Sequence, residues 1–130
     1  MSHFSTIKTK LKETEPLIKA LDLLGYNPNQ DEKFVKGYQG KFTAVDISLD
    51  LPENTKVGFK WDNKTNSYEL VTDLDLWKYN LPVERFISKV TQMYAYQTII
   101  SQTQKDGYQI VEQKNENDGS IELVLTKWEA

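Results

Sequence analysis

The chain has 130 residues, of which 38% are hydrophobic and 27% charged, and its formal net charge is −3. This length is typical of a single domain spanning residues 1–130, and the mixture of apolar residues with charges of both signs argues against intrinsic disorder. Because cysteine is absent, disulfides, thiolate metal sites and a thiol nucleophile are excluded, and the acidic balance argues against nucleic acid as a partner.

The beginning of the chain predicts a strand followed by a helix. Branched side chains that alternate with polar ones predict a strand over residues 2–10. Apolar residues then recur with the spacing of one helical face, at Leu17, Ala20, Leu21 and Leu24. We expect Pro16 in the first turn of this helix, after a cap at Thr14 or Glu15. Gly25 fits the position that ends a helix.

The middle of the chain predicts an antiparallel meander. Residues 42–51, 56–61 and 67–74 alternate apolar and polar side chains, with short polar turns between them. In the first of these strands the expected apolar face comprises Val45, Ile47, Leu49 and Leu51. Residues 27–41, which overlap the basic and aromatic stretch KFVKGYQGKF, are interpreted either as one short strand or as a mobile loop.

A second helix follows the meander. It is expected to start near Pro82, with Asn80 as its cap, and to run to Lys105. Its main apolar stripe comprises Phe86, Val90, Met93, Gln97 and Ile100.

The last part of the chain predicts a hairpin. Residues 108–113 and 120–128 are interpreted as two strands, and the Asp-Gly pair within 117–120 is a strong turn signal. The complete order β-α-β-β-β-α-β-β predicts an α+β fold, with a mostly antiparallel sheet and both helices on one face.

No catalytic arrangement is recognisable. His3 is the single histidine, and it has no second histidine or cysteine with which to form a nucleophilic group. Asp46 and Asp50 fall on the polar face of a predicted strand, where contact with solvent explains them. The glycines of GYQG match neither phosphate-binding motif. The sequence therefore predicts no catalytic residue, no metal and no cofactor, and assigns no enzyme class.

The connection before the second helix, DLDLWKYNLP, is the strongest candidate surface. It places Trp77 and Tyr79 close in sequence to Asp73 and Asp75, and aromatic residues with polar neighbours are common in protein-binding hot spots. The alternative is that Trp77 closes one end of the core. A ligand or ion site would use the same loop or His3.

Three segments carry a family resemblance: the opening MSHFSTIKTKLKETEPLIKALDLLGY, the long second helix with its Tyr and Gln residues, and the closing DGSIELVLTKW. Over the whole chain they resemble the hypothetical chloroplast reading frame thirty-five family, a domain of unknown function found in cyanobacteria and algal plastids. The resemblance implies no assigned activity. It does imply a location in the cyanobacterial cytosol or the plastid stroma. It also implies an assembly or adaptor role with an AAA-type ATPase as candidate partner, because related genes lie beside genes for such ATPases in some bacteria.

We therefore expect a non-enzymatic protein-binding or assembly module of a photosynthetic cell. The alternative is a small-molecule or ion-binding domain that uses His3 or the loop containing Asp73, Asp75 and Trp77. We expect no membrane span, because no apolar run approaches the roughly 20 residues that cross a bilayer.

Overall fold

The computed structural model describes residues 4–115 and 121–127. Its helices are α1 (Thr14–Leu23) and α2 (Val83–Lys105), with short 3₁₀ turns η1 (Tyr38–Gly40) and η2 (Leu74–Leu76). Its strands are β1 (Phe4–Lys8), β2 (Phe34–Lys36), β3 (Phe42–Ala44), β4 (Ile47–Leu51), β5 (Thr55–Asp62), β6 (Ser67–Asp73), β7 (Tyr108–Asn115) and β8 (Ile121–Lys127).

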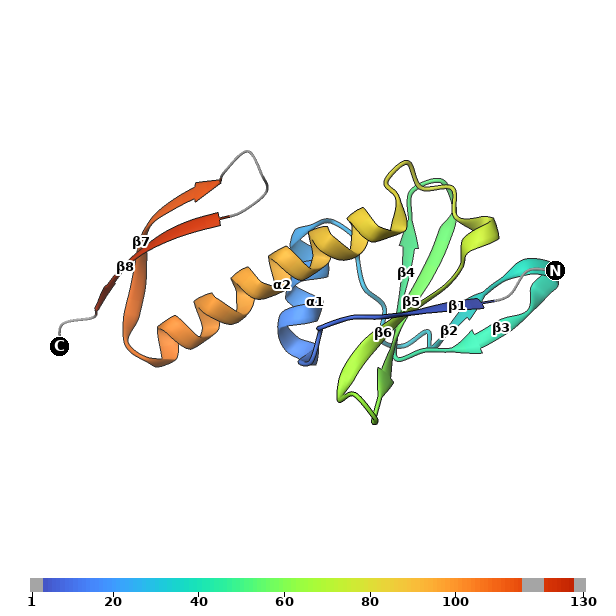
Figure 1. Ribbon diagram of the computed structural model, residues 1–130, viewed down its shortest axis with the longest axis horizontal. Coiled ribbons are helices and arrows are strands. Elements are labelled where there is room, and N and C mark those ends of the chain that lie inside the picture. The colour runs from blue at the N-terminus through green and yellow to red at the C-terminus, as the bar shows by residue number, and fades with distance from the viewer. Residues whose placement is uncertain (1–3, 116–120, 128–130) are drawn as a thin grey trace.

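The main sheet has four antiparallel strands in the order β1-β6-β5-β4 (Figure 1). The first strand pairs with the last of the meander, so that Phe4 lies opposite Asp73. Strands β2 and β3 form a separate two-stranded sheet, and so do β7 and β8. The predicted α+β class with a mostly antiparallel sheet is confirmed.

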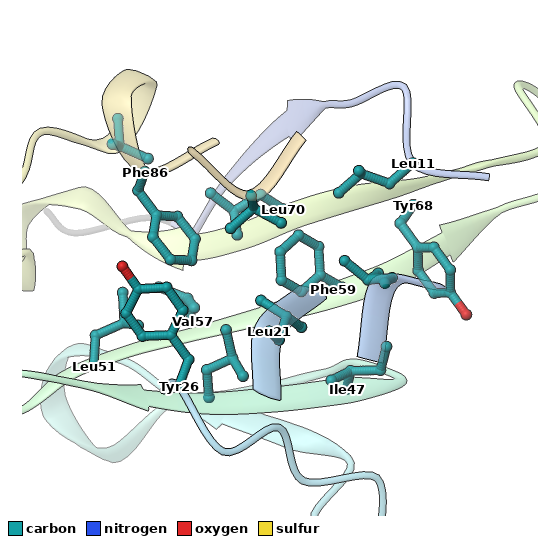
Figure 2. Close-up of a cluster of buried hydrophobic side chains, with 14 residues drawn as sticks. Leu11, Leu21, Tyr26, Ile47, Leu51, Val57, Phe59, Tyr68, Leu70 and Phe86 are labelled. Atoms are coloured by element: carbon teal, nitrogen blue, oxygen red, sulfur yellow. The ribbon is translucent and has the colours of Figure 1, made fainter. Parts of the chain in front are cut away.

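Both helices contribute to one core on one face of the main sheet. Figure 2 shows Phe59 in the middle of this cluster, with the rings of Tyr26 and Phe86 at one end and Tyr68 at the other. The core also contains Leu17 and Leu21 of α1, Val83 and Val90 of α2, and the inward side chains of β4, β5 and β6. Burial of these apolar groups is the main source of folding free energy.

A second, smaller cluster covers the opposite face of the sheet. Val35 of β2 packs there with Val45 and Val71, and Phe4 packs against them. Gly58 of β5 lies beneath this contact, because a Cβ at Gly58 would come within 2.5 Å of Val45 Cγ1 and 2.8 Å of Val35 Cγ2. The sheet is therefore covered on both faces around β5.

Helix α2 extends well beyond the sheet. Val83, Phe86 and Val90 in its first half are buried, whereas Thr103 is the buried residue of its second half. The β7–β8 hairpin follows at the far end of the helix, away from the main sheet (Figure 1). None of the helices in the described ranges has the length and apolar character needed to cross a bilayer.

The largest difference from the predicted elements lies between the helices, where five strands replace the expected three. The expected strand 42–51 is divided at Asp46 into β3 and β4, and residues 27–41 contain β2 and η1. Val45 consequently faces Val35 on the second face, rather than the core to which Ile47 belongs.

The two predicted helix caps also differ from the structure. Helix α1 begins at Thr14, whose hydroxyl forms a hydrogen bond with the Tyr68 hydroxyl instead of capping the helix. Helix α2 begins after Pro82, so Asn80 is not its cap. The predicted turn at 117–120 lies outside the described residues.

Candidate functional site

The predicted surface around residues 73–79 faces two different parts of the fold. Asp73, at the end of β6, is buried with 4% of its surface exposed. One of its carboxylate oxygens accepts a hydrogen bond from the Tyr38 N–H at 3.1 Å, and the other accepts one from the Asp75 N–H at 3.1 Å. Asp73 therefore connects the end of β6 to the tip of the β2–β3 hairpin, while the Asp75 side chain lies at the surface.

Trp77 and Tyr79 pack at the end of the main core. Trp77 is half-buried, its ring centroid lies 5.9 Å from that of Phe86, and its Nε1–H donates to the Leu81 carbonyl at 3.1 Å. The hydroxyl groups of Tyr79 and Tyr26 lie 3.1 Å apart. This hydrogen bond, together with partial burial, raises the pKa of Tyr79. These contacts agree with the alternative interpretation, in which Trp77 closes one end of the core.

The structure does not gather the predicted site residues into one site. Asp73 is turned toward the β2–β3 hairpin, whereas Trp77 and Tyr79 are turned toward α2 and the core. His3 lies outside the described residues. Within the described ranges, no group of three or more histidine, aspartate or glutamate side chains is placed to bind a metal ion.

A different surface, which the sequence did not single out as a site, is formed by residues 33–42, here called the aromatic hairpin. Phe34 and Phe42 pair edge to face on its outer side, with ring centroids 5.2 Å apart and an interplanar angle of 89°. Their exposed fractions are 46% and 59%, and Tyr38 at the tip is 46% exposed. Large apolar side chains in a contiguous exposed group are typical of interaction sites.

The aromatic hairpin is fixed to the sheet by its inner side. Val35 is 2% exposed and packs on Val45 and Val71. The Gly37 N–H donates to the Lys41 carbonyl at 2.7 Å, which closes the turn, and Asp73 binds the backbone of Tyr38. The outer aromatic side chains are therefore presented on a backbone that is attached to the core at both its middle and its tip.

The aromatic hairpin is also a basic segment within an acidic chain. Residues 33–42 contain Lys33, Lys36 and Lys41 and no acidic residue, a charge of +3. Because the whole chain carries −3, the remaining residues together carry −6. In the sequence, this hairpin could have been recognised from the alternating polar and apolar residues of KFVK and GKFT on either side of a turn that contains glycine.

Comparison with known proteins identifies the family. A family model described as "Protein of unknown function (DUF1257)" matches residues 20–124. The uncharacterized protein ycf35 of Pyropia yezoensis is 35% identical over 98% of each chain. The ycf35 proteins of Guillardia theta and Cyanophora paradoxa are 36% and 33% identical, with the same coverage. No solved structure matches the chain.

The name ycf35 denotes a chloroplast reading frame, and these relatives are plastid-encoded. The match extends over nearly the whole chain, which confirms the resemblance inferred from its opening and closing segments. The chain therefore belongs to the DUF1257 family of proteins of unknown function, together with the ycf35 proteins of algae.

Proposed function

We propose that the protein is a non-enzymatic protein-binding module, with an assembly or adaptor role, and that the aromatic hairpin is its binding surface. The observation that carries this proposal is the exposed Phe34–Phe42 pair on a hairpin whose opposite side is buried. A rigid aromatic pair loses little conformational entropy on binding, and aromatic side chains supply much of the free energy at protein interfaces.

The charge of the hairpin specifies the complementary surface. Lys33, Lys36 and Lys41 belong to the same segment as the aromatic side chains, and Lys36 lines a surface depression together with Phe34 and Phe42. The partner is therefore expected to present an apolar group within an acidic rim. The resemblance suggests an AAA-type ATPase as a partner, and the cyanobacterial cytosol or the plastid stroma as the place of binding. Both are parts of this proposal.

The alternative of a small-molecule or ion site at Asp73, Asp75 and Trp77 has less geometric support. Both carboxylate oxygens of Asp73 accept backbone N–H groups, and Trp77 is turned toward Phe86. An ion bound by Asp73 would have to share its oxygens with these two N–H groups, at a side chain that is buried.

The test compares capture of partners by two variants. Phe34→Ser with Phe42→Ser removes the aromatic pair, and Leu23→Ser is the matched control, because Leu23 is 63% exposed on α1. Each tagged protein is used to capture partners from a native lysate, and any candidate is then purified and its affinity measured directly. We expect at least about tenfold weaker binding for the double variant and an unchanged affinity for the control.

The proposal fails if the purified partner binds the double variant as tightly as the wild type. It also fails if nuclease treatment abolishes capture, since nucleic acid would then be the ligand. Circular dichroism confirms that each variant is folded before its affinity is interpreted.

A further inference from the structure

A large cleft lies between the beginning of α1, with the connection that precedes it, and the second half of α2. This half of α2 extends beyond the main sheet (Figure 1). Its volume is about 1220 Å³. It is lined by the connection between β1 and α1 on one side and by α2 residues from Tyr94 to Lys105 on the other. None of its lining residues belongs to the aromatic hairpin, so this surface is separate from the proposed binding surface.

The cleft carries a local positive charge. Lys10, Lys12, Lys19 and Lys105 line it, together with Glu13 and Glu15, which amounts to four positive and two negative charges, a net +2 on a chain of −3. All four lysines are exposed, and none of them forms a salt bridge with a carboxylate of the described residues. Their ammonium groups are therefore available to an acidic ligand.

The wall of the cleft is fixed before any ligand binds. The Tyr94 hydroxyl of α2 accepts hydrogen bonds from the backbone N–H groups of Lys12 and Glu13, at 3.1 and 3.0 Å. This pair of bonds joins the β1–α1 connection to the helix opposite. Five residues further along α2, Ile99 is 48% exposed and provides an apolar contact within the cleft.

We propose that this cleft binds an acidic segment of another protein, with an apolar side chain of that segment on Ile99. The volume exceeds the roughly 300–1,000 Å³ of sites for small ligands, which favours a polypeptide. Glu13 and Glu15 lie among the lysines and would repel the uniformly charged backbone of a nucleic acid, whereas a protein segment can place neutral or basic residues opposite them. The protein then has two separate docking surfaces, as an adaptor requires.

The experiment uses the full chain and a fluorescent synthetic peptide composed of glutamate and leucine as the probe. Fluorescence anisotropy measures its affinity for the wild type, for Lys12→Glu with Lys105→Glu, and for Lys60→Glu with Lys64→Glu. Lys60 and Lys64 are exposed lysines of β5 and the turn that follows it, outside the cleft, so this variant carries the same change in net charge. We expect at least about tenfold weaker binding for the cleft variant and less than about twofold for the control.

A second readout locates the bound peptide. Amide chemical shifts of Lys12, Glu13 and Tyr94 should move on titration, and Ile99→Ala should weaken binding without changing the melting temperature. The variant lacking Phe34 and Phe42 should bind the peptide normally, so that failure of this inference is distinguishable from failure of the proposed function.

Three outcomes would overturn the inference. The first is an absence of saturable binding, or equal losses for the cleft and control variants, which would indicate nonspecific attraction between charges. The second is tighter binding of a single-stranded RNA of equal charge at the same residues. The third is a concentration-dependent dimer that the cleft variant abolishes, which would make a second copy of this chain the occupant.

Discussion

The Asp73 carboxylate and the Tyr38 N–H, 35 residues apart in sequence, form a 3.1 Å hydrogen bond that joins the end of β6 to the tip of the aromatic hairpin. Asp73 is buried, and its second oxygen accepts from the Asp75 N–H. Asp73 was predicted to belong to a binding surface at residues 73–79. Instead it is buried and supports the aromatic hairpin.

Asp73→Ala should destabilise the protein, because it leaves the N–H groups of Tyr38 and Asp75 without this acceptor. We expect a loss of about 1–3 kcal/mol in the free energy of unfolding, measured by chemical denaturation, together with faster hydrogen exchange at Tyr38. Asp50→Ala is the control, since Asp50 forms an exposed ion pair with Lys56 that contributes about 0–1 kcal/mol. Equal unfolding midpoints for the two variants would contradict this role of Asp73.

Trp77→Ala should lower stability more than it lowers partner binding. The ring packs on Phe86 and its Nε1–H binds the Leu81 carbonyl. Because Trp77 is only half-buried, we expect a loss of about 2–4 kcal/mol, somewhat less than the roughly 3–5 kcal/mol of buried large aromatic residues. Trp77→Phe should recover part of it. A Trp77→Ala protein with native melting temperature and no partner binding would instead support a hot spot in the predicted loop.

Gly58→Ala should destabilise the protein by overpacking. The added methyl group would lie 2.5 Å from Val45 Cγ1 and 2.8 Å from Val35 Cγ2, and overpacking of this kind costs about 1–3 kcal/mol. The same substitution in a Val45→Ala background should cost less, because the closest methyl group is gone, while the contacts at 2.8 Å with Val35 Cγ2 and the Cβ of residue 45 remain. Thermal melting of the four proteins of this cycle measures the difference. If the losses of stability caused by the two substitutions are additive, Val45 does not limit the space above Gly58.

The stability of the protein should fall with rising pH in a range set partly by Tyr79. Its hydrogen bond with Tyr26, together with partial burial, raises the pKa of Tyr79 in the folded state. From about pH 10, the usual tyrosine pKa, the unfolded chain loses this proton while the folded chain retains it. The stabilisation is therefore complete below about pH 10 and is lost as the pH rises through the folded pKa. In Tyr79→Phe, denaturation measured against pH should show a shallower decline above this point, and an identical slope would contradict the assignment.

Local periodicity was sufficient to predict the helices and the pairing of β4, β5 and β6. The apolar spacing of Leu17 and Leu21 specifies the buried side of α1, and the alternation through Val57 and Phe59 specifies the core face of β5. Positive backbone angles of 83° and 82° at Gly25 and Gly107 agree with their positions after the two helices.

The aromatic hairpin and the break between β3 and β4 at Asp46 could not be predicted from periodicity, because they depend on contacts between residues distant in sequence. Asp46 accepts the Trp61 N–H through its side chain at 2.7 Å, and its own N–H donates to the Phe59 carbonyl. The chain bends at this point and Val45 is placed against Val35. A sheet covered on both faces is not distinguishable from a half-exposed one by alternation alone, because the covering residue comes from a segment distant in sequence.

The length of α2 has a geometric consequence for any assembly that this protein enters. A helix of 23 residues is about 34 Å long at the standard rise of 1.5 Å per residue. It therefore acts as a spacer that sets both the separation and the relative rotation of the main sheet and the β7–β8 hairpin. Insertion of a single residue into its second half would turn the hairpin by about 100° around the helix axis, whereas insertion of a full heptad would nearly restore its orientation about 10 Å further away.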